Sequence, residues 1–185
     1  MSTSTPASRV QEILPQLFKA SLTPGKPYLQ FQLTETITAL MPLEQVHESI
    51  IVKATEISLL PSMHESVMGI MSSRNHVFCV IDLAQLLMLR STLISSRQYQ
   101  IIVVRVSSNK TSPEASSKGN SLLGIAVSHL QGITRLTEEK FQSPTGDFPS
   151  SLTPYLRGAV VAEEQQMLVL DPQAIAAASA LYEIR

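Results

Sequence analysis

Few residues of this 185-residue chain have side chains suited to chemistry, among them one cysteine and four histidines. His76 and Cys79 would make a thiol–imidazole pair if they met, but residues three apart on a strand point to opposite faces. A small buried thiol is therefore the expected role of Cys79. His47, His64 and His129 are dispersed and lack the spacing of metal ligands. We expect neither a metal site nor a cofactor.

One arginine, Arg74, occupies a more informative position, at the centre of the segment 69–82. The segment is predicted to form a hairpin, because β-branched and aromatic residues follow a short polar turn. Asn75 suits that turn, since asparagine tolerates a left-handed backbone better than most residues. A charged residue at the tip of a rigid hairpin indicates a contact surface rather than a reaction centre. Binding is therefore the first functional hypothesis, ahead of catalysis.

The composition restricts the class of protein. The hydrophobic fraction of 44% and the length suit one domain, or two small lobes that share a core. A formal net charge of -1 and the absence of tryptophan argue against a nucleic-acid-binding surface. No secretory signal and no apolar run of about 20 residues is present, so we expect a cytoplasmic protein without membrane insertion.

The first 27 residues are predicted to form an N-terminal extension. Apolar residues recur there at helical spacing and would share one face; they are Val10, Ile13, Leu14, Leu17 and Phe18. Pro15 interrupts this helix, and a proline- and glycine-containing linker over 23–27 follows it. The apolar stripe could dock on its own domain or in the groove of a partner, and the sequence favours neither.

Residues 28–185 are predicted to form one mainly β domain. We expect roughly nine or ten short strands and three or four short helices, a pattern typical of a barrel or sandwich. Helices over 83–89 and from 172 to Tyr182 should begin at the capping residues Asp82 and Asp171. The polar loop 107–121 should be mobile. The expected core comprises Val80, Ile102, Val104, Ile125, Val127 and Leu168.

In this order the segments resemble the CheW family of bacterial chemotaxis coupling proteins. The shared marks are Phe31-x-Leu33, Leu43-x-x-Val46-x-Glu48, Leu60-Pro61, Gly69-Ile70, Arg74, Val80–Leu83, Ile101–Val104, Leu123-Gly124-Ile125-x-Val127, Leu156-x-Gly158 and Leu168–Asp171. The hairpin turn departs from the family's Asn-Leu-Arg-Gly, since it reads Ser-Ser-Arg-Asn over 72–75, and Cys79 replaces a usual proline. This divergence fits the pilus-linked, PilI-like branch better than the flagellar one.

The resemblance implies two SH3-like five-stranded β-barrel lobes packed together. It also implies a non-enzymatic adaptor that couples the cytoplasmic tip of a methyl-accepting chemoreceptor or photoreceptor to a CheA-type histidine kinase. The output would be chemotaxis, phototaxis or type IV pilus-driven twitching motility. The N-terminal extension would dock a third partner, such as a response regulator.

The predicted partner-binding residues are those of the hairpin tip, one strand-end carboxylate and the N-terminal stripe: Ser73, Arg74, Asn75, Glu48, Val10, Ile13, Leu14, Leu17 and Phe18. Two of them have simpler interpretations, Arg74 as a solvated turn residue and Glu48 as an exposed strand-end carboxylate. Alternative functions are a β-barrel interaction module outside taxis and a thiol-dependent enzyme that uses Cys79. A nucleic-acid-binding barrel is a further alternative.

Overall fold

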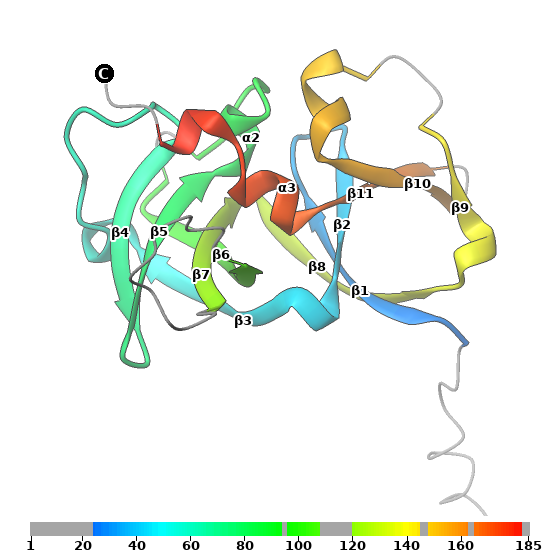
Figure 1. Cartoon of the computed structure of the whole chain (residues 1–185), viewed down its shortest axis with the longest axis horizontal. Coiled ribbons are helices and arrows are strands. Elements are labelled where there is room, and N and C mark those ends of the chain that lie inside the picture. The colour runs from blue at the N-terminus through cyan, green and yellow to red at the C-terminus, as the bar shows by residue number, and fades with distance from the viewer. Residues whose placement is uncertain (1–23, 94–95, 108–119, 145–147, 163–164, 183–185) are drawn as a thin grey trace, which may run out of the picture.

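The computed structural model describes residues 24–93, 96–107, 120–144, 148–162 and 165–182, which form two curled β-sheets side by side (Figure 1). The first sheet has six strands in the order β8-β1-β2-β11-β10-β9. Its strands are β1 (Lys26–Gln32), β2 (Thr38–Pro42), β8 (His129–Leu136), β9 (Phe141–Gln142), β10 (Leu156–Ala162) and β11 (Gln165–Leu170). The prediction of a mainly β protein with two SH3-like lobes is confirmed, with the short strand β9 as an addition to this lobe.

The second sheet has five strands in the order β3-β6-β7-β5-β4. Its strands are β3 (Val46–Lys53), β4 (Val67–Ser73), β5 (His76–Asp82), β6 (Gln98–Ser107) and β7 (Asn120–Val127). An isolated antiparallel bridge between Ser58 and Ile70 joins the segment after β3 to β4, so the two ends of the sheet meet and a barrel closes. Gly69 permits this closure, because a Cβ there would lie 2.2 Å from the Ser58 carbonyl oxygen.

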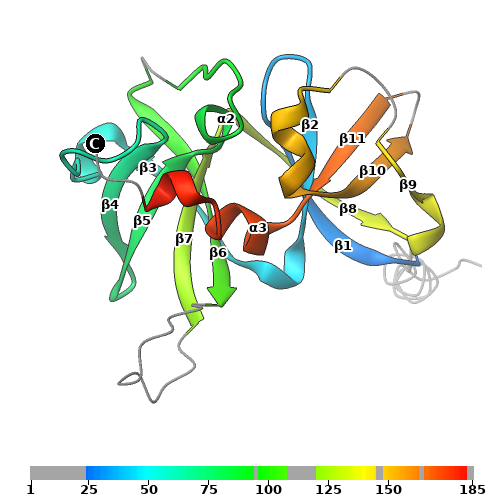
Figure 2. The ribbon, with the colours of Figure 1, turned by 45° about the horizontal axis from the view of Figure 1, so that its top comes forward.

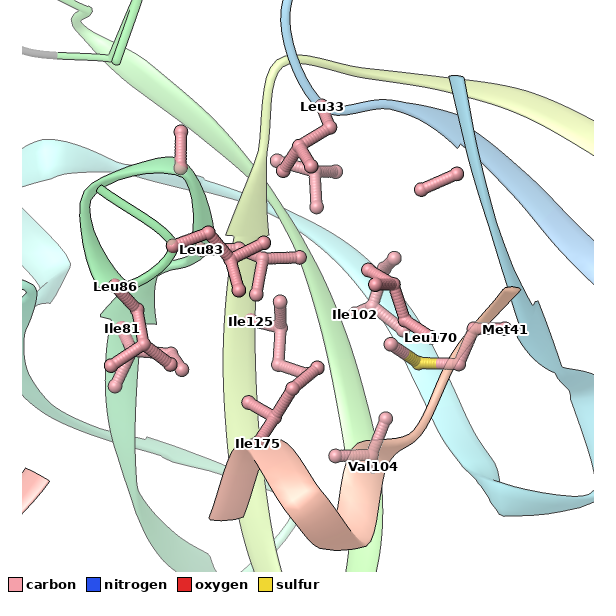
Figure 3. Close-up of a cluster of buried hydrophobic side chains, with 14 of the residues drawn as sticks. Leu33, Met41, Ile81, Leu83, Leu86, Ile102, Val104, Ile125, Leu170 and Ile175 are labelled. Atoms are coloured by element: carbon pink, nitrogen blue, oxygen red, sulfur yellow. The ribbon is translucent and has the colours of Figure 1, made fainter. Parts of the chain in front are cut away.

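The apolar residues separate into three clusters that follow the strand alternation. On β6, Ile101 and Val103 point into the second barrel, whereas Ile102 and Val104 point into the largest cluster. That cluster contains residues of both sheets and of the helices, so it is the core that the two lobes share (Figure 3). A smaller cluster fills the first lobe. The six predicted core residues, Val80, Ile102, Val104, Ile125, Val127 and Leu168, are all buried, as predicted.

Two short α-helices begin at the predicted caps and lie against the shared core (Figure 2). They are α2 (Leu83–Leu86) and α3 (Pro172–Ala176). The carboxylate of Asp82 accepts a hydrogen bond from the Gln85 amide, and that of Asp171 from the Gln173 amide. The 3₁₀ helices are η1 (Leu43–Gln45), η2 (Ala54–Glu56), η3 (Glu138–Lys140), η4 (Ser150–Tyr155) and η5 (Ser179–Leu181).

Both α-helices are shorter than the sequence predicts. Ala178 adopts an extended backbone, which separates α3 from η5 and ends the predicted continuous helix to Tyr182. The side chain of Tyr182 is exposed, and its hydroxyl donates a hydrogen bond to the Ala176 carbonyl. β1 begins at Lys26, within the predicted linker.

Several predictions lie outside the described residues, namely the N-terminal stripe and most of the loop 107–121. No helix in the described ranges is both long and apolar enough to cross a membrane.

Candidate partner-binding site

The β4–β5 hairpin turns through two residues, Arg74 and Asn75, which connect the paired residues Ser73 and His76. Both turn residues have positive φ, 44° for Arg74 and 66° for Asn75, as a two-residue type I′ hairpin requires. Asparagine tolerates this backbone, whereas an arginine there costs roughly 1–2 kcal/mol. A residue held in a sparsely populated conformation is a candidate for function. Arginine is not the residue that this backbone conformation favours, so the role of its side chain needs an explanation.

The side chain of Arg74 forms an ion pair with Glu48 of β3, with Nε 3.2 Å from Oε2. The Ser73 hydroxyl donates a hydrogen bond of 3.0 Å to the other carboxylate oxygen, Oε1. The Glu48 side chain is only 9% exposed, whereas that of Arg74 is 78% exposed. The interpretation of Glu48 as an exposed carboxylate is therefore wrong. The structure brings Ser73, Arg74, Asn75 and Glu48 together at one end of the second barrel.

Barrel closure explains how Glu48 reaches the hairpin. β3 and β4 are the two outer strands of the five-stranded sheet, and they become neighbours when the sheet curls. A β-bulge on β3 then sets the direction of the side chains, because Val46 pairs with Val104 and Glu48 with Val103, leaving His47 as the extra residue. Bulges of this kind re-aim side chains and are frequent next to functional sites.

Three further residues join this end of the barrel, and the sequence prediction missed them as site residues: His47, His76 and Arg105. Arg105 Nη2 lies 2.7 Å from His47 Nδ1, and Nη1 donates to the Val46 carbonyl. The rings of His47 and His76 meet edge to face, with centroids 6.0 Å apart. Alternation along β6 could have placed Arg105 at the barrel end, since Ile101 and Val103 point inward before it. The bulge that turns His47 toward Arg105 has no comparable sequence signal.

We call this constellation the barrel mouth; it consists of His47, Glu48, Ser73, Arg74, Asn75, His76 and Arg105. The hairpin tip and the end of β6 lie at the same end of the second barrel in both ribbon views (Figures 1 and 2). Its exposed charged side chains, Arg74 and Arg105, are cationic, while the carboxylate of Glu48 is largely buried beneath them. The mouth therefore presents donors and positive charge to a partner.

The other candidate chemical residues lie elsewhere. Cys79 points to the opposite face of β5 from the inward-facing Phe78 and Val80, and it packs against the shared core. Burial raises the pKa of its thiol, which disfavours the reactive thiolate. His64 bonds locally to Ser66. In the part of the chain that the structure describes, no three His, Cys, Asp or Glu side chains are placed to hold a metal ion.

Comparison with known proteins agrees with this architecture. The CheW-like domain family matches residues 27–180. The chain belongs to this family. A solved structure, that of the scaffolding protein TtCheW from Thermoanaerobacter tengcongensis, is similar with a TM-score of 0.65 and 18% sequence identity, over 85% of this chain and 96% of that chain. No curated protein shows a significant sequence match. Within this CheW-like chain, the barrel mouth is formed by strands of the second lobe.

Proposed function

We propose that this CheW-like protein is a non-enzymatic scaffold that couples a methyl-accepting receptor to a CheA-type histidine kinase in the cytoplasm. The observation that carries the proposal is the arginine at the hairpin tip. Arg74 is held at a positive φ, pairs with a largely buried carboxylate through Nε, and exposes most of its side chain. The similarity to a scaffolding protein supports the same conclusion.

The ion pair gives the tip a defined shape before any partner arrives. Glu48 is fixed by the Ser73 hydroxyl, and it in turn limits the rotamers of Arg74. A side chain that is already ordered loses less conformational entropy when it binds. Within the described residues, the terminal nitrogens of Arg74 have no partner, so they are free to donate to a carboxylate or carbonyl of another protein.

The structure favours a scaffold over the thiol-enzyme alternative. An activated cysteine needs a base or cation nearby that lowers its pKa. The pKa of Cys79 is shifted in the opposite direction by burial, and its Sγ makes a long contact of 3.9 Å with the Val80 carbonyl oxygen. His76 lies on the other face of the same strand, as the residue spacing predicts.

We further propose that the chain serves a phototaxis or type IV pilus pathway and that its N-terminal stripe docks a third partner. The first proposal is supported by the divergent turn over 72–75, whose Arg74 is kept while its neighbours differ from the usual pattern. The second is supported by the apolar spacing from Val10 to Phe18, on a segment interrupted by Pro15 and too short to be a stable helix alone. The candidate third partner is a response regulator.

Reconstitution tests the central proposal. A receptor cytoplasmic fragment and a CheA-type kinase from the same organism are mixed with and without this protein, and co-sedimentation and kinase autophosphorylation are measured. We expect the kinase to sediment with the receptor only when the protein is present, and its activity to change with receptor state. Kinase recruitment that does not depend on the protein would contradict the proposal.

Deletion of residues 1–22 tests the N-terminal stripe separately. Unchanged unfolding with one partner lost would support a docking peptide. A fall in stability with all partners retained would show that the stripe packs on its own domain.

A further inference from the structure

The barrel mouth carries more positive charge than its ion pair requires. Glu48 is matched by Arg74, with 3.2 Å between Oε2 and Nε. Among the described residues Arg105 has no such match, because its guanidinium contacts the Val46 carbonyl and the His47 ring and no carboxylate. The Val46 carbonyl is neutral, and the His47 ring is neutral when it accepts this hydrogen bond through Nδ1. The described side chains of the mouth therefore have one guanidinium charge without a counter-charge, and it lies on an exposed residue.

His76 adds a second exposed side chain to the same end of the barrel. Its side chain is exposed, meets the edge of His47, and has no hydrogen-bond partner within the described residues. The charged or titratable groups of the mouth are His47 and Glu48 on β3, Arg74 at the turn and Arg105 on β6. An imidazole ring always has at least one N–H donor, so His76 can donate a hydrogen bond to a partner at the mouth.

We propose that the barrel mouth binds a segment of a partner protein that is rich in aspartate and glutamate, with Arg105 and His76 as its recognition residues. This inference deepens the proposed function, on which it rests, because it assigns a chemical class to the partner surface at the same site. Arg105 would pair a carboxylate through the N–H groups of its guanidinium that its contacts with Val46 and His47 leave available.

A fluorescein-labelled decaglutamate peptide probes the inference by fluorescence anisotropy at low ionic strength. Arg105→Gln should weaken binding by about 3–10-fold, as for the loss of a charge at a complementary surface. Arg135→Gln is the matched control, because Arg135 is an exposed arginine on β8 of the first lobe that donates to the Gly25 carbonyl. It should leave the affinity within about 1.5-fold, since it lies away from the mouth.

A second variant tests His76 separately from the arginines. His76→Gln should weaken decaglutamate binding by about 2–5-fold, because it removes an exposed ring that meets His47 at the mouth. Unchanged affinity in His76→Gln would overturn the assignment of His76.

Other outcomes overturn the inference as a whole. It fails if the unmodified protein does not bind decaglutamate, or if Arg105→Gln and Arg135→Gln weaken binding equally. It also fails if a single-stranded decathymidine oligonucleotide binds as tightly with the same sensitivity to Arg105→Gln, which would indicate a general polyanion surface. Receptor and kinase capture, measured in parallel, keeps this result apart from the proposed function: capture that survives Arg105→Gln leaves the scaffold intact and rejects only the acidic segment.

Discussion

Two segments of the chain, β4 to α2 and β10 to α3, fold as the same unit in the two lobes. Each begins with a bulged strand at a glycine, since Gly69 pairs with Val80 and Gly158 pairs with Val169 after a register shift. Each then returns along a second strand, and an aspartate at or just after the end of that strand caps a helix. The glycine and the aspartate are separated equally in both units, so the shared features belong to the fold.

The two units share their backbone features but differ in the charge at the hairpin tip. The second lobe carries Arg74 and Asn75 at its tip, and the sequence positions that correspond in the first lobe are Glu163 and Glu164, outside the described residues. The glycines and aspartates therefore determine the fold of the unit, whereas the residues at the tip can differ without changing that fold. It also isolates Arg74 as the feature that the fold does not require.

The largest difference that we expect between the two units is the cost of replacing the glycine of the bulge, Gly69 or Gly158, with alanine. Gly69→Ala would place a Cβ 2.2 Å from the Ser58 carbonyl oxygen at the barrel seam, whereas in Gly158→Ala the nearest atom, the Gln142 carbonyl oxygen, is 3.4 Å away. We expect Gly69→Ala to lower the free energy of unfolding by about 4–5 kcal/mol and Gly158→Ala by about 1–2 kcal/mol. Urea denaturation measures both. Equal costs would show that the seam does not depend on this close backbone approach.

The shared core should tie the two units into one folding transition. Ile125 of the second sheet and Leu168 of the first are both fully buried in the common cluster. Truncation of either to alanine should cost about 2–5 kcal/mol. The control Ile133→Ala, at a residue that is 63% exposed on β8, should cost no more than about 0.5 kcal/mol. Separate transitions for the two lobes would contradict a common core.

The two capping aspartates should differ by their burial. Asp82 is 3% exposed and also accepts from the Ser91 hydroxyl, whereas Asp171 is partly exposed and pairs with Arg157 at 3.2 Å. We expect Asp82→Ala to cost about 2 kcal/mol and Asp171→Ala about 1 kcal/mol, which are the upper and middle values for a lost cap. Thermal unfolding of the two variants shows which substitution costs more stability. A larger cost at Asp171 would mean that its ion pair, rather than the cap, dominates.

Cys79 should have the smallest effect on function. Because burial raises the pKa of its thiol, the thiolate population at neutral pH is below that of a free cysteine, and alkylation by iodoacetamide should be slow and accelerate toward alkaline pH. Cys79→Ala should leave receptor and kinase capture unchanged. A loss of capture in a variant that still folds would restore a role for the thiol.

Local signals predicted much of this structure. Asn75 marked the hairpin turn, and Asp82 and Asp171 marked the helix starts, because each acts within a few residues of itself. The apolar run 101–104 is buried on both faces of its strand, since its alternate residues fill two different cores.

The site depended on information that local patterns do not contain. Glu48 and Arg74 meet only because the outer strands of the second sheet close on each other, which no spacing in the sequence encodes. The bulge at His47 and the break at Ala178 depend on tertiary packing in the same way. His47, His76 and Arg105 were consequently missed as site residues, and the last helix was predicted to continue to Tyr182.

The central claim is that Arg74 serves binding rather than folding, and Arg74→Asn tests it most directly. Asparagine suits the positive φ of the turn and removes the guanidinium, whereas Arg74→Glu would set a second carboxylate against Glu48. Asn75→Gly is the matched control, since glycine also accepts the left-handed backbone.

Unfolding and the capture of receptor and kinase are measured together on both variants. We predict that Arg74→Asn keeps the free energy of unfolding within about 1 kcal/mol, because the lost ion pair is largely exposed on its arginine side. We also predict that it weakens capture of at least one partner by about tenfold or more, while Asn75→Gly leaves capture unchanged. Full capture of both partners by a stable Arg74→Asn variant would contradict the account.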